Sequence, residues 1–274
     1  MRSPLTAVAI VAVLALAAGA APATARAAGN KVKRPSLSIK RNSPKRAARP
    51  PVKTRLKNFF LRPLRRLQPI SRQQHPYAPV KAGDTRVFEI AKPGGESSLV
   101  TQEVSAVRIQ DGRLRAQISQ TFESDGHSST THHVQDVTTE GMLMATAEKL
   151  DHPPAVPITV SGVALPRKMS PGQTWKSSMS WQQGGATIEH RSQGRVLRKV
   201  RMAGPDRVMR DGVEIETVSH STTTQDGTPS RSKQIQRGIY LKGLGEVENT
   251  IRTEGTPGSM TRRLVGFTPG GDPG

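Results

Sequence analysis

Apolar and polar residues alternate along much of the chain after residue 83. In the stretch 114–122, Leu, Ala, Ile, Gln and Phe at the even positions alternate with Arg, Gln, Ser and Thr. This period of two predicts a strand that buries one face and exposes the other. A shorter run from Val213 to Thr217 alternates in the same way. Helical periodicity of useful length is absent from this part of the sequence.

The same pattern predicts a series of short strands. They cover 86–91, 98–109, 114–122, 129–137 and 142–147, and then 174–181, 186–202, 213–217, 230–236, 245–253 and 260–267. Consecutive antiparallel strands without crossover helices close most simply into a barrel or a curled sheet. The predicted fold is all-β: an antiparallel curled sheet or barrel-like body built from two tandem meander repeats, preceded by a disordered basic arm.

Four Asp-Gly pairs predict hairpin turns between these strands. They lie at 111–112, 125–126, 211–212 and 226–227. Asp-Gly between alternating runs favours a type I′ turn, because both central residues of that turn need a positive φ.

A similar pattern of residues and turn signals occurs twice in the sequence. Val80 to Thr85 opens the first copy and Met169 to Thr174 opens the second, and similar turn signals follow each opening. Each copy is too small to bury a core alone, so both are expected to share one body. The predicted boundaries are a single β body at 80–267, with repeat one at 80–150, a linker at 151–166 and repeat two at 167–267, and then a flexible tail at 268–274.

The N-terminus has the layout of a secretory signal peptide. Arg2 precedes an uncharged apolar run, and small residues follow it, which predicts cleavage after a signal peptide at 1–27. The alternative is a transmembrane anchor, but the run is shorter than the roughly 20 residues that a spanning helix needs. No Cys occurs, which excludes disulfides, a lipid-modified cysteine and cysteine metal sites. The predicted location is exported, periplasmic or extracellular, in association with the envelope.

The charge of the protein is concentrated before the body. The formal net charge is +20, and the stretch 26–83 holds 17 basic residues and no acidic one. From Asp84 onward, 23 basic residues face 21 acidic ones, a net charge of +2. Residues 28–79 are also rich in Pro, so they are predicted to be a disordered basic arm.

Within this arm, residues 54–70 form a short amphipathic pattern. Leu and Phe recur at three- and four-residue steps between cations, with a break at Pro63. Such a segment is expected to lie on an anionic membrane or an envelope polymer. The alternatives are that it docks onto the body, or that the arm binds nucleic acid, which an exported protein meets less readily. The predicted surface-binding residues are Arg55, Lys57, Phe59, Phe60, Arg62, Arg65 and Arg66.

Short motifs resemble a known family. The two openings, with Trp175 in the second, and the stretch Gly238 to Val247 resemble secreted bacterial β-repeat proteins of unknown function. Those proteins carry a Pro-Leu-Lys-x-Gly-x-x-Trp opening and end their repeats in Gly-x-Gly-x-Val. The resemblance implies an extracytoplasmic location and curled sheets distantly like those of envelope lipoprotein carriers. Arg86 departs from the pattern, because it stands where the first tryptophan is expected.

The sequence shows little sign of catalytic chemistry. It contains no Gly-x-Ser-x-Gly elbow, no His-Glu-x-x-His and no phosphate-binding loop, so no catalytic residue and no cofactor is predicted. His127 and His133 share strand parity and are weak candidates for a metal site. Trp175 and Trp181 are expected in the core, with a ligand-stacking platform as the alternative.

Three functions stay open at this stage. The favoured one is a non-enzymatic, exported protein whose arm binds an anionic surface and whose body binds a protein partner or an apolar ligand. The second is a secreted hydrolase with a site assembled from strand residues such as His133 or His220. The third is a purely structural surface protein.

Overall fold

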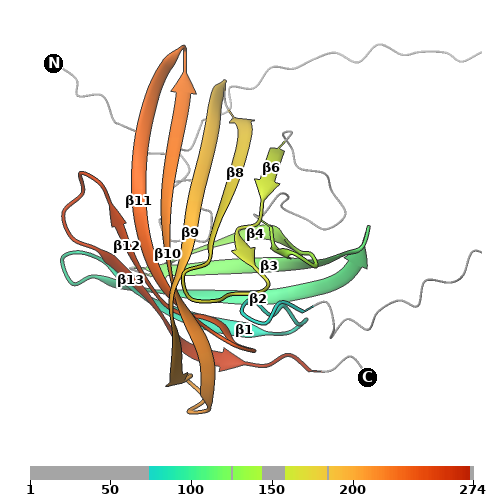
Figure 1. Ribbon diagram of the computed structural model, residues 1–274. Helices are drawn as coiled ribbons and strands as arrows, with labels where there is room; N and C mark the ends of the chain where they lie inside the picture. The colour runs from blue at the N-terminus through green and yellow to red at the C-terminus, as the bar shows by residue number, and fades with distance from the viewer. Residues whose placement is uncertain (1–73, 125, 144–157, 184, 272–274) are drawn as a thin grey trace, which may run out of the picture. The chain divides into compact units, whose positions relative to one another are not determined.

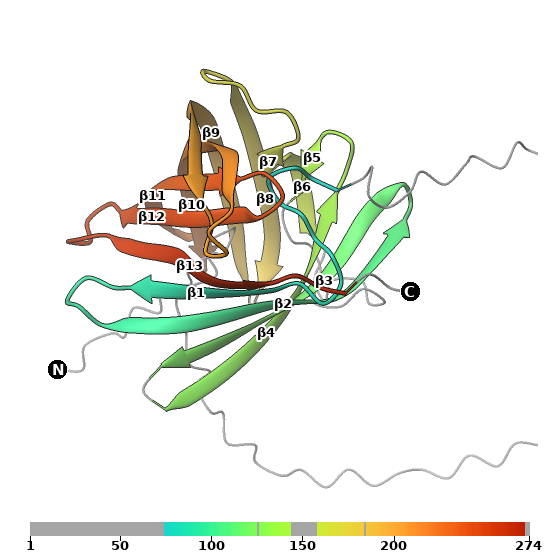
Figure 2. The ribbon, with the colours of Figure 1, turned by 90° about the horizontal axis from the view of Figure 1, so that it is seen from below.

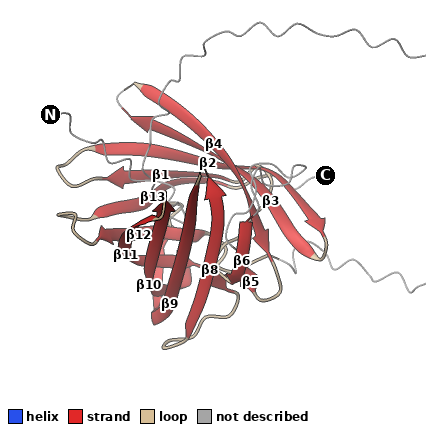
Figure 3. Ribbon diagram, turned by 90° about the horizontal axis from the view of Figure 1, so that it is seen from above, coloured by secondary structure: helices blue, strands red, loops and turns tan. Residues whose placement is uncertain are grey.

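The computed structural model describes residues 74–124, 126–143, 158–183 and 185–271. These residues belong to one compact unit. They form thirteen strands in a single antiparallel sheet, with no helix among them, which confirms the predicted all-β fold (Figure 3). In this part of the chain no helix is long and apolar enough to cross a membrane. The predicted signal peptide and residues 28–73 of the predicted arm lie outside the described residues.

Most strands begin and end within a few residues of their predicted limits. Their bounds are β1 Thr85–Ala91, β2 Ser97–Gln110, β3 Arg113–Ser124, β4 His127–Val137, β5 Gly141–Met142, β6 Ile158–Gly162, β7 Leu165–Pro166, β8 Thr174–Gln183, β9 Ala186–Ala203, β10 Met209–Gln225, β11 Thr228–Leu241, β12 Gly245–Thr253 and β13 Met260–Thr268.

The sheet consists of two groups of consecutive strands. β8 to β12 form one group and β1 to β5 the other, and β13 pairs with both β12 and β1. Figure 1 shows β8–β11 running across the direction of β1–β4. The last strand of the chain therefore joins the two groups through its hydrogen bonds.

The two end strands of the sheet are neighbours in the sequence. β6 lies at one end of the strand order and β7 at the other, yet only Val163 and Ala164 separate them. The Ala164 amide donates to the Met142 carbonyl at 2.8 Å, and the Ala164 carbonyl accepts from Trp175 Nε1 at 3.0 Å. Ala164 thus ties β5 to β8, although no ladder between β6 and β7 closes the sheet (Figure 2).

Two of the predicted hairpin turns have the expected type I′ conformation. The φ values are 50° and 73° at Asp111 and Gly112, and 50° and 76° at Asp226 and Gly227. A third turn, between β3 and β4, contains Gly126 with a φ of 77°.

The predicted turn at 211–212 is wrong. Asp211 and Gly212 lie inside β10, where Gly212 pairs with Val200 on one side and Leu241 on the other. A Cβ at Gly212 would collide with the carbonyl oxygen of Tyr240, so the glycine serves a close approach of two strands.

The turn between β9 and β10 lies a few residues earlier. The Gly204 amide donates to the Val208 carbonyl, and Arg207 has a φ of 61°. Asp206 accepts two hydrogen bonds from Arg210, at 2.7 and 2.6 Å, which hold the turn at its exposed end.

The turns that open the two predicted repeats make matching hydrogen bonds. The Gly83 amide donates to the Val104 carbonyl, and the Gly172 amide donates to the Val196 carbonyl, both at 2.8 Å. Gly83 and Gly172 also have nearly equal φ values of 83° and 82°. The assignment of two repeats stays a prediction, and these hydrogen bonds support it.

Side chains cap the same two turns in the same way. The Lys81 amide donates to Asp84 Oδ2 at 3.3 Å, and the Ser170 amide donates to Gln173 Oε1 at 3.1 Å. Asp84 and Gln173 each follow directly after the glycine of the turn. Two different side chains therefore accept the same kind of hydrogen bond, from the amide three residues earlier.

The body begins earlier and ends later than predicted. Residues 74–79, placed in the arm by the sequence, are packed into it: His75 is fully buried and Tyr77 is 6% exposed. The predicted linker contains β6 and β7. In the predicted tail, the Gly270 amide donates to Asp84 Oδ1 at 3.0 Å. Specific hydrogen bonds therefore order segments whose composition is that of loops.

His75 holds the first described segment through a neutral imidazole. Nδ1 accepts from the Tyr77 amide at 3.1 Å, so Nε2 carries the proton and donates to the Pro166 carbonyl at 3.1 Å. Burial lowers the pKa of His75 from 6.5 to about 4. Protonation would remove the acceptor at Nδ1 and place a charge in the interior.

This arrangement predicts that the body loses stability as the pH falls. The folded pKa lies below the unfolded value, so the contribution of His75 is complete above pH 6.5 and declines between 6.5 and 4. The expected loss by pH 5 is about 2 kcal/mol in the free energy of unfolding. Urea unfolding of the wild type and of His75→Ala at pH 7 and pH 5 checks this, and an equally steep pH dependence in the variant would contradict it.

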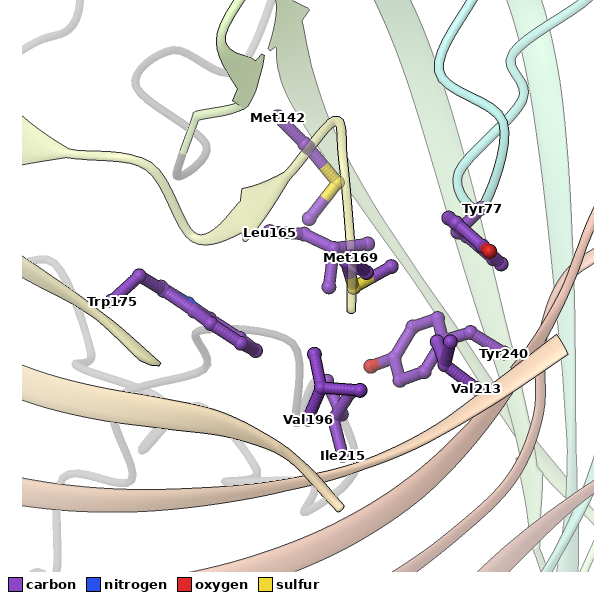
Figure 4. Close-up of a cluster of buried hydrophobic side chains, with 9 residues drawn as sticks. All are labelled: Tyr77, Met142, Leu165, Met169, Trp175, Val196, Val213, Ile215 and Tyr240. Atoms are coloured by element: carbon purple, nitrogen blue, oxygen red, sulfur yellow. The ribbon is translucent and has the colours of Figure 1, made fainter. Parts of the chain in front are cut away.

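Among the described residues, the apolar cluster with the most buried members lies where β5, β7 and residues 74–79 meet β8–β11. Its members are Tyr77, Met142, Leu165, Met169, Trp175, Val196, Val213, Ile215 and Tyr240 (Figure 4). Trp175 is 9% exposed, and its indole lies where a Cβ at Gly194 would stand. Trp181 is only half-buried, so the two tryptophans contribute unequally.

Candidate functional site

A small cavity of about 80 Å³ lies inside the body and has an unusually charged wall. Its wall combines apolar residues and Tyr77 with six polar side chains from six strands, which we call the polar chamber: Arg86, Gln102, Gln135, Tyr240, Glu246 and Arg262. Arg86, Tyr240, Glu246 and Arg262 are each at most 8% exposed. Buried charges are costly unless they are paired, so their partners decide what the chamber can do.

Arg86 is anchored on one side of the chamber. Its Nη2 contacts Asp84 Oδ2 at 3.3 Å and donates to the Pro79 carbonyl at 2.9 Å, and its Nε donates to the Leu244 carbonyl at 3.2 Å. Burial lowers the pKa of Arg86, although Asp84 opposes this shift. The contacts of its guanidinium join residues 74–79, β1 and the β11–β12 turn.

Glu246 is the acceptor on the opposite side. Its Oε2 accepts from the Tyr240 hydroxyl at 3.0 Å and from Asn249 Nδ2 at 3.2 Å. Its Oε1 lies 3.3 Å from Nη1 of Arg262, an ion pair without the alignment of a hydrogen bond. Burial, followed by the charge of Glu246, raises the pKa of Tyr240 well above 10, so the phenol remains a donor.

The guanidinium of Arg262 is held by an aromatic ring as well as by its ion pair. Its guanidinium carbon lies 3.7 Å from the centroid of the Phe88 ring, a cation–π contact. Its charge also contributes, after burial, to lowering the pKa of His133 to about 4. Arg262 therefore faces an aromatic ring, a carboxylate and a neutral imidazole.

Comparison with known proteins finds distant structural likeness only. No family model and no curated protein matches the chain. A Bacteroides fragilis protein thought to be exported, with a YmcC-like fold, is 10% identical with a TM-score of 0.49, over 70% of this chain and 98% of that one. A protein of Parabacteroides distasonis, thought to be a lipoprotein, is 10% identical with a TM-score of 0.47, over 71% and 99%. Likeness at this level assigns neither a family nor a function to the chain, and the β-repeat resemblance stays a prediction.

Arg86 occupies the place that Trp175 holds in the second predicted repeat. Each is the third residue after the glycine of its opening turn. Trp175 Nε1 donates to the Ala164 carbonyl and Arg86 Nη2 donates to the Pro79 carbonyl, so each contacts the segment before its own turn. The tryptophan lies in an apolar cluster, whereas the arginine lines the polar chamber.

The structure does not gather the predicted histidine pair. His127 and His133 lie on β4, and six residues of an extended strand span about 20 Å, so they cannot ligate one ion together. Among the described residues no group of three His, Cys, Asp or Glu could hold a metal. The predicted surface-binding residues of the arm lie outside the described part of the chain.

His190 and His220 lie on opposite faces of the sheet. His190 is 3% exposed, and its Nδ1 contacts Ser221 Oγ at 2.9 Å, whereas His220 is exposed. Within the described part of the chain, His190 makes no hydrogen bond or ion pair with a carboxylate, so this pair lacks the third group of a hydrolase triad.

Sequence reasoning missed the residues of the polar chamber. Arg262 shares strand parity with the buried Leu264, whereas Glu246 has the parity of the outward positions of β12 and is turned inward by the bulge at Val247. The departure at Arg86 from the tryptophan pattern was a usable signal, because it placed a charge where a core residue is expected.

Proposed function

We propose that the protein is exported and is held by its basic arm at an anionic surface of the cell envelope. The observation that carries this proposal is the separation of charge: 17 cations and no acid at 26–83, against a net charge of +2 from Asp84 onward. Each cation near an anionic membrane contributes about 1 kcal/mol, so part of the arm suffices for binding. The signal-peptide pattern supports the extracytoplasmic side.

The contact with the surface is assigned to the amphipathic segment 54–70. Phe59 and Phe60 are two of the five Phe residues of the chain and stand between clustered cations. Aromatic rings in the lipid boundary and Arg residues at the head groups are the arrangement of interfacial helices. An envelope polymer would use the same cations without the aromatic rings.

The body is proposed to act by binding rather than by catalysis. The cavity at the polar chamber is about 80 Å³, and its wall contains the ion-paired Arg86, Glu246 and Arg262 beside apolar side chains. Pockets for ordinary apolar ligands are several hundred cubic ångströms and mostly apolar. This cavity therefore favours a small polar group over the apolar ligand that the sequence suggested.

Neutralising the five cations of this segment is expected to weaken binding to anionic vesicles by at least about 100-fold. The variant carries Gln at Arg55, Lys57, Arg62, Arg65 and Arg66, and vesicle co-sedimentation measures the partition coefficient. The physical reason is the loss of five charges at the point of contact.

A matched variant carries Gln at five cations nearer the signal peptide: Lys31, Lys33, Arg34, Lys40 and Arg41. It loses the same net charge, so it separates a local contact from the total charge of the arm. It is expected to bind more tightly than the first variant. Equal binding by the wild type and the first variant would contradict the proposal.

A further inference from the structure

Unpaired polar atoms gather in and around the polar chamber. Among the described residues, buried atoms without a hydrogen-bond partner include Arg262 Nε and Glu246 Oε1 in its wall. Asn249 Oδ1, Gln120 Oε1 and His133 Nδ1 also lack a partner and belong to residues that pair directly with wall residues on neighbouring strands. Each such atom costs about 1–3 kcal/mol if nothing binds it. A group that satisfies several of them at once would recover this cost.

The register of the strands explains why these atoms lie together. Gln102 pairs with Arg86 on one side and with Gln120 on the other, so these three side chains form one row across β1, β2 and β3. In the adjacent row His133 pairs with Ile118, which lines the cavity. Arg262 pairs with Asn249 across β12 and β13.

The charges of the site balance, which restricts the ligand. Arg86 is paired with Asp84 and Arg262 with Glu246, so two cations face two anions. An ion would leave this cluster with a net charge in a buried place, which is costly. The ligand should therefore be neutral.

The unpaired atoms also restrict its hydrogen bonding. Three of the five are oxygens that accept, on Gln120, Glu246 and Asn249, and one is the Nε–H of Arg262, which donates; the fifth, His133 Nδ1, donates or accepts according to the tautomer of the ring. A hydroxyl both donates and accepts, so a group with two neighbouring hydroxyls can serve several of these atoms together. The space of about 80 Å³ equals that of roughly two or three water molecules, the size of such a group.

We propose that the polar chamber binds a neutral group with two neighbouring hydroxyls, either a small free polyol or the end of a larger hydroxylated molecule. Gln102 and Gln135 are only half-buried, and the deeper Arg86, Glu246 and Arg262 lie behind them. The glutamines thus mark the side by which the group enters, and Glu246 and Arg262 fix it inside. This site rests on the body alone and is independent of the role of the arm.

Titration of the full chain with ethylene glycol and glycerol tests the site, followed by NMR signals of the Arg Nε–H groups and the Gln and Asn side-chain amides. Propan-1-ol, which has one hydroxyl and a similar size, is the control, and a methyl glycoside distinguishes the end of a sugar from a free polyol. We expect saturable shifts with the diols or the glycoside and none with propan-1-ol.

Two variants locate the binding. Gln120→Leu removes one unpaired oxygen, and it should weaken binding about three- to tenfold, the range for one neutral hydrogen bond. Gln193→Leu is the matched control on an exposed position of β9 and should leave binding unchanged. If Gln120→Leu does not fold, the wild-type titration still decides. Absence of saturable shifts with every diol, or equal shifts with propan-1-ol, would overturn the proposal and leave a chamber that holds water only.

Discussion

Replacing Asp84 by Ala is expected to lower the free energy of unfolding by about 3–5 kcal/mol. Asp84 is 4% exposed and accepts from the Gly270 amide at 3.0 Å, the Lys81 amide at 3.3 Å and Arg86 Nη2 at 3.3 Å. Its loss leaves the buried guanidinium of Arg86 without a counter-charge. Denaturant unfolding measures the change.

Asp206→Ala is the matched control for this prediction. Asp206 also pairs with an arginine, through two short bonds to Arg210, but at the exposed β9–β10 turn. Exposed ion pairs contribute about 0–1 kcal/mol, so its loss should be small. Similar losses in the two variants would show that burial of the Asp84 pair does not matter.

Replacing Trp175 by Ala is also expected to lower the free energy of unfolding, by about 3–5 kcal/mol. The substitution removes the indole from the apolar cluster and leaves the Ala164 carbonyl without its donor. Because Ala164 is also bonded to Met142, the contact between β5 and β8 should loosen. Denaturant unfolding gives the loss of stability, and hydrogen exchange at the Ala164 amide reports the loosening.

Trp181→Ala provides the comparison, since both tryptophans lie on one face of β8. Trp181 is half-buried and lies outside the three apolar clusters of the described residues, so a clearly smaller loss is expected. A larger loss from Trp181→Ala than from Trp175→Ala would contradict the described core.

The strands could be predicted because alternation is local. A strand with one buried face repeats every two residues, and this signal survives in β3, β9 and β12 without knowledge of their neighbours. Eleven of the thirteen strands followed from it, and so did the antiparallel order within each group; β6 and β7 lie in the segment predicted as a linker. The pairing of β13 with β1 did not, because it joins residues about 170 positions apart, which no local pattern reveals.

The errors also have physical causes. Asp211-Gly212 has the composition of a turn, but the glycine there permits the close approach of Tyr240 across the strands. His75 lies in a stretch that reads as part of the arm, and only its contacts with Tyr77 and Pro166 order it. Composition predicts the conformation of a segment in isolation. In the folded protein, tertiary hydrogen bonds impose a different conformation on these segments.

Apart from the departure at Arg86, no signal in the sequence pointed to the polar chamber, for a related reason. Arg and Glu are normally exposed, so Arg86, Glu246 and Arg262 read as surface residues. Their burial depends on the pairing of β13 with both β12 and β1, which places these three strands side by side, and on β2, β4 and β11, which supply other parts of the wall. The arm presents the opposite case, since its charge is plain in the sequence.

The central claim is that the arm, rather than the body, attaches the protein to an anionic surface. Its most direct test compares the full chain with a variant lacking residues 31–72, in co-sedimentation with anionic vesicles at low and at about 0.5 M ionic strength. We expect the full chain to bind at low salt and to be released at high salt, and the variant to fold but to bind at neither. Salt-sensitive binding by the shortened variant equal to that of the full chain would contradict the claim.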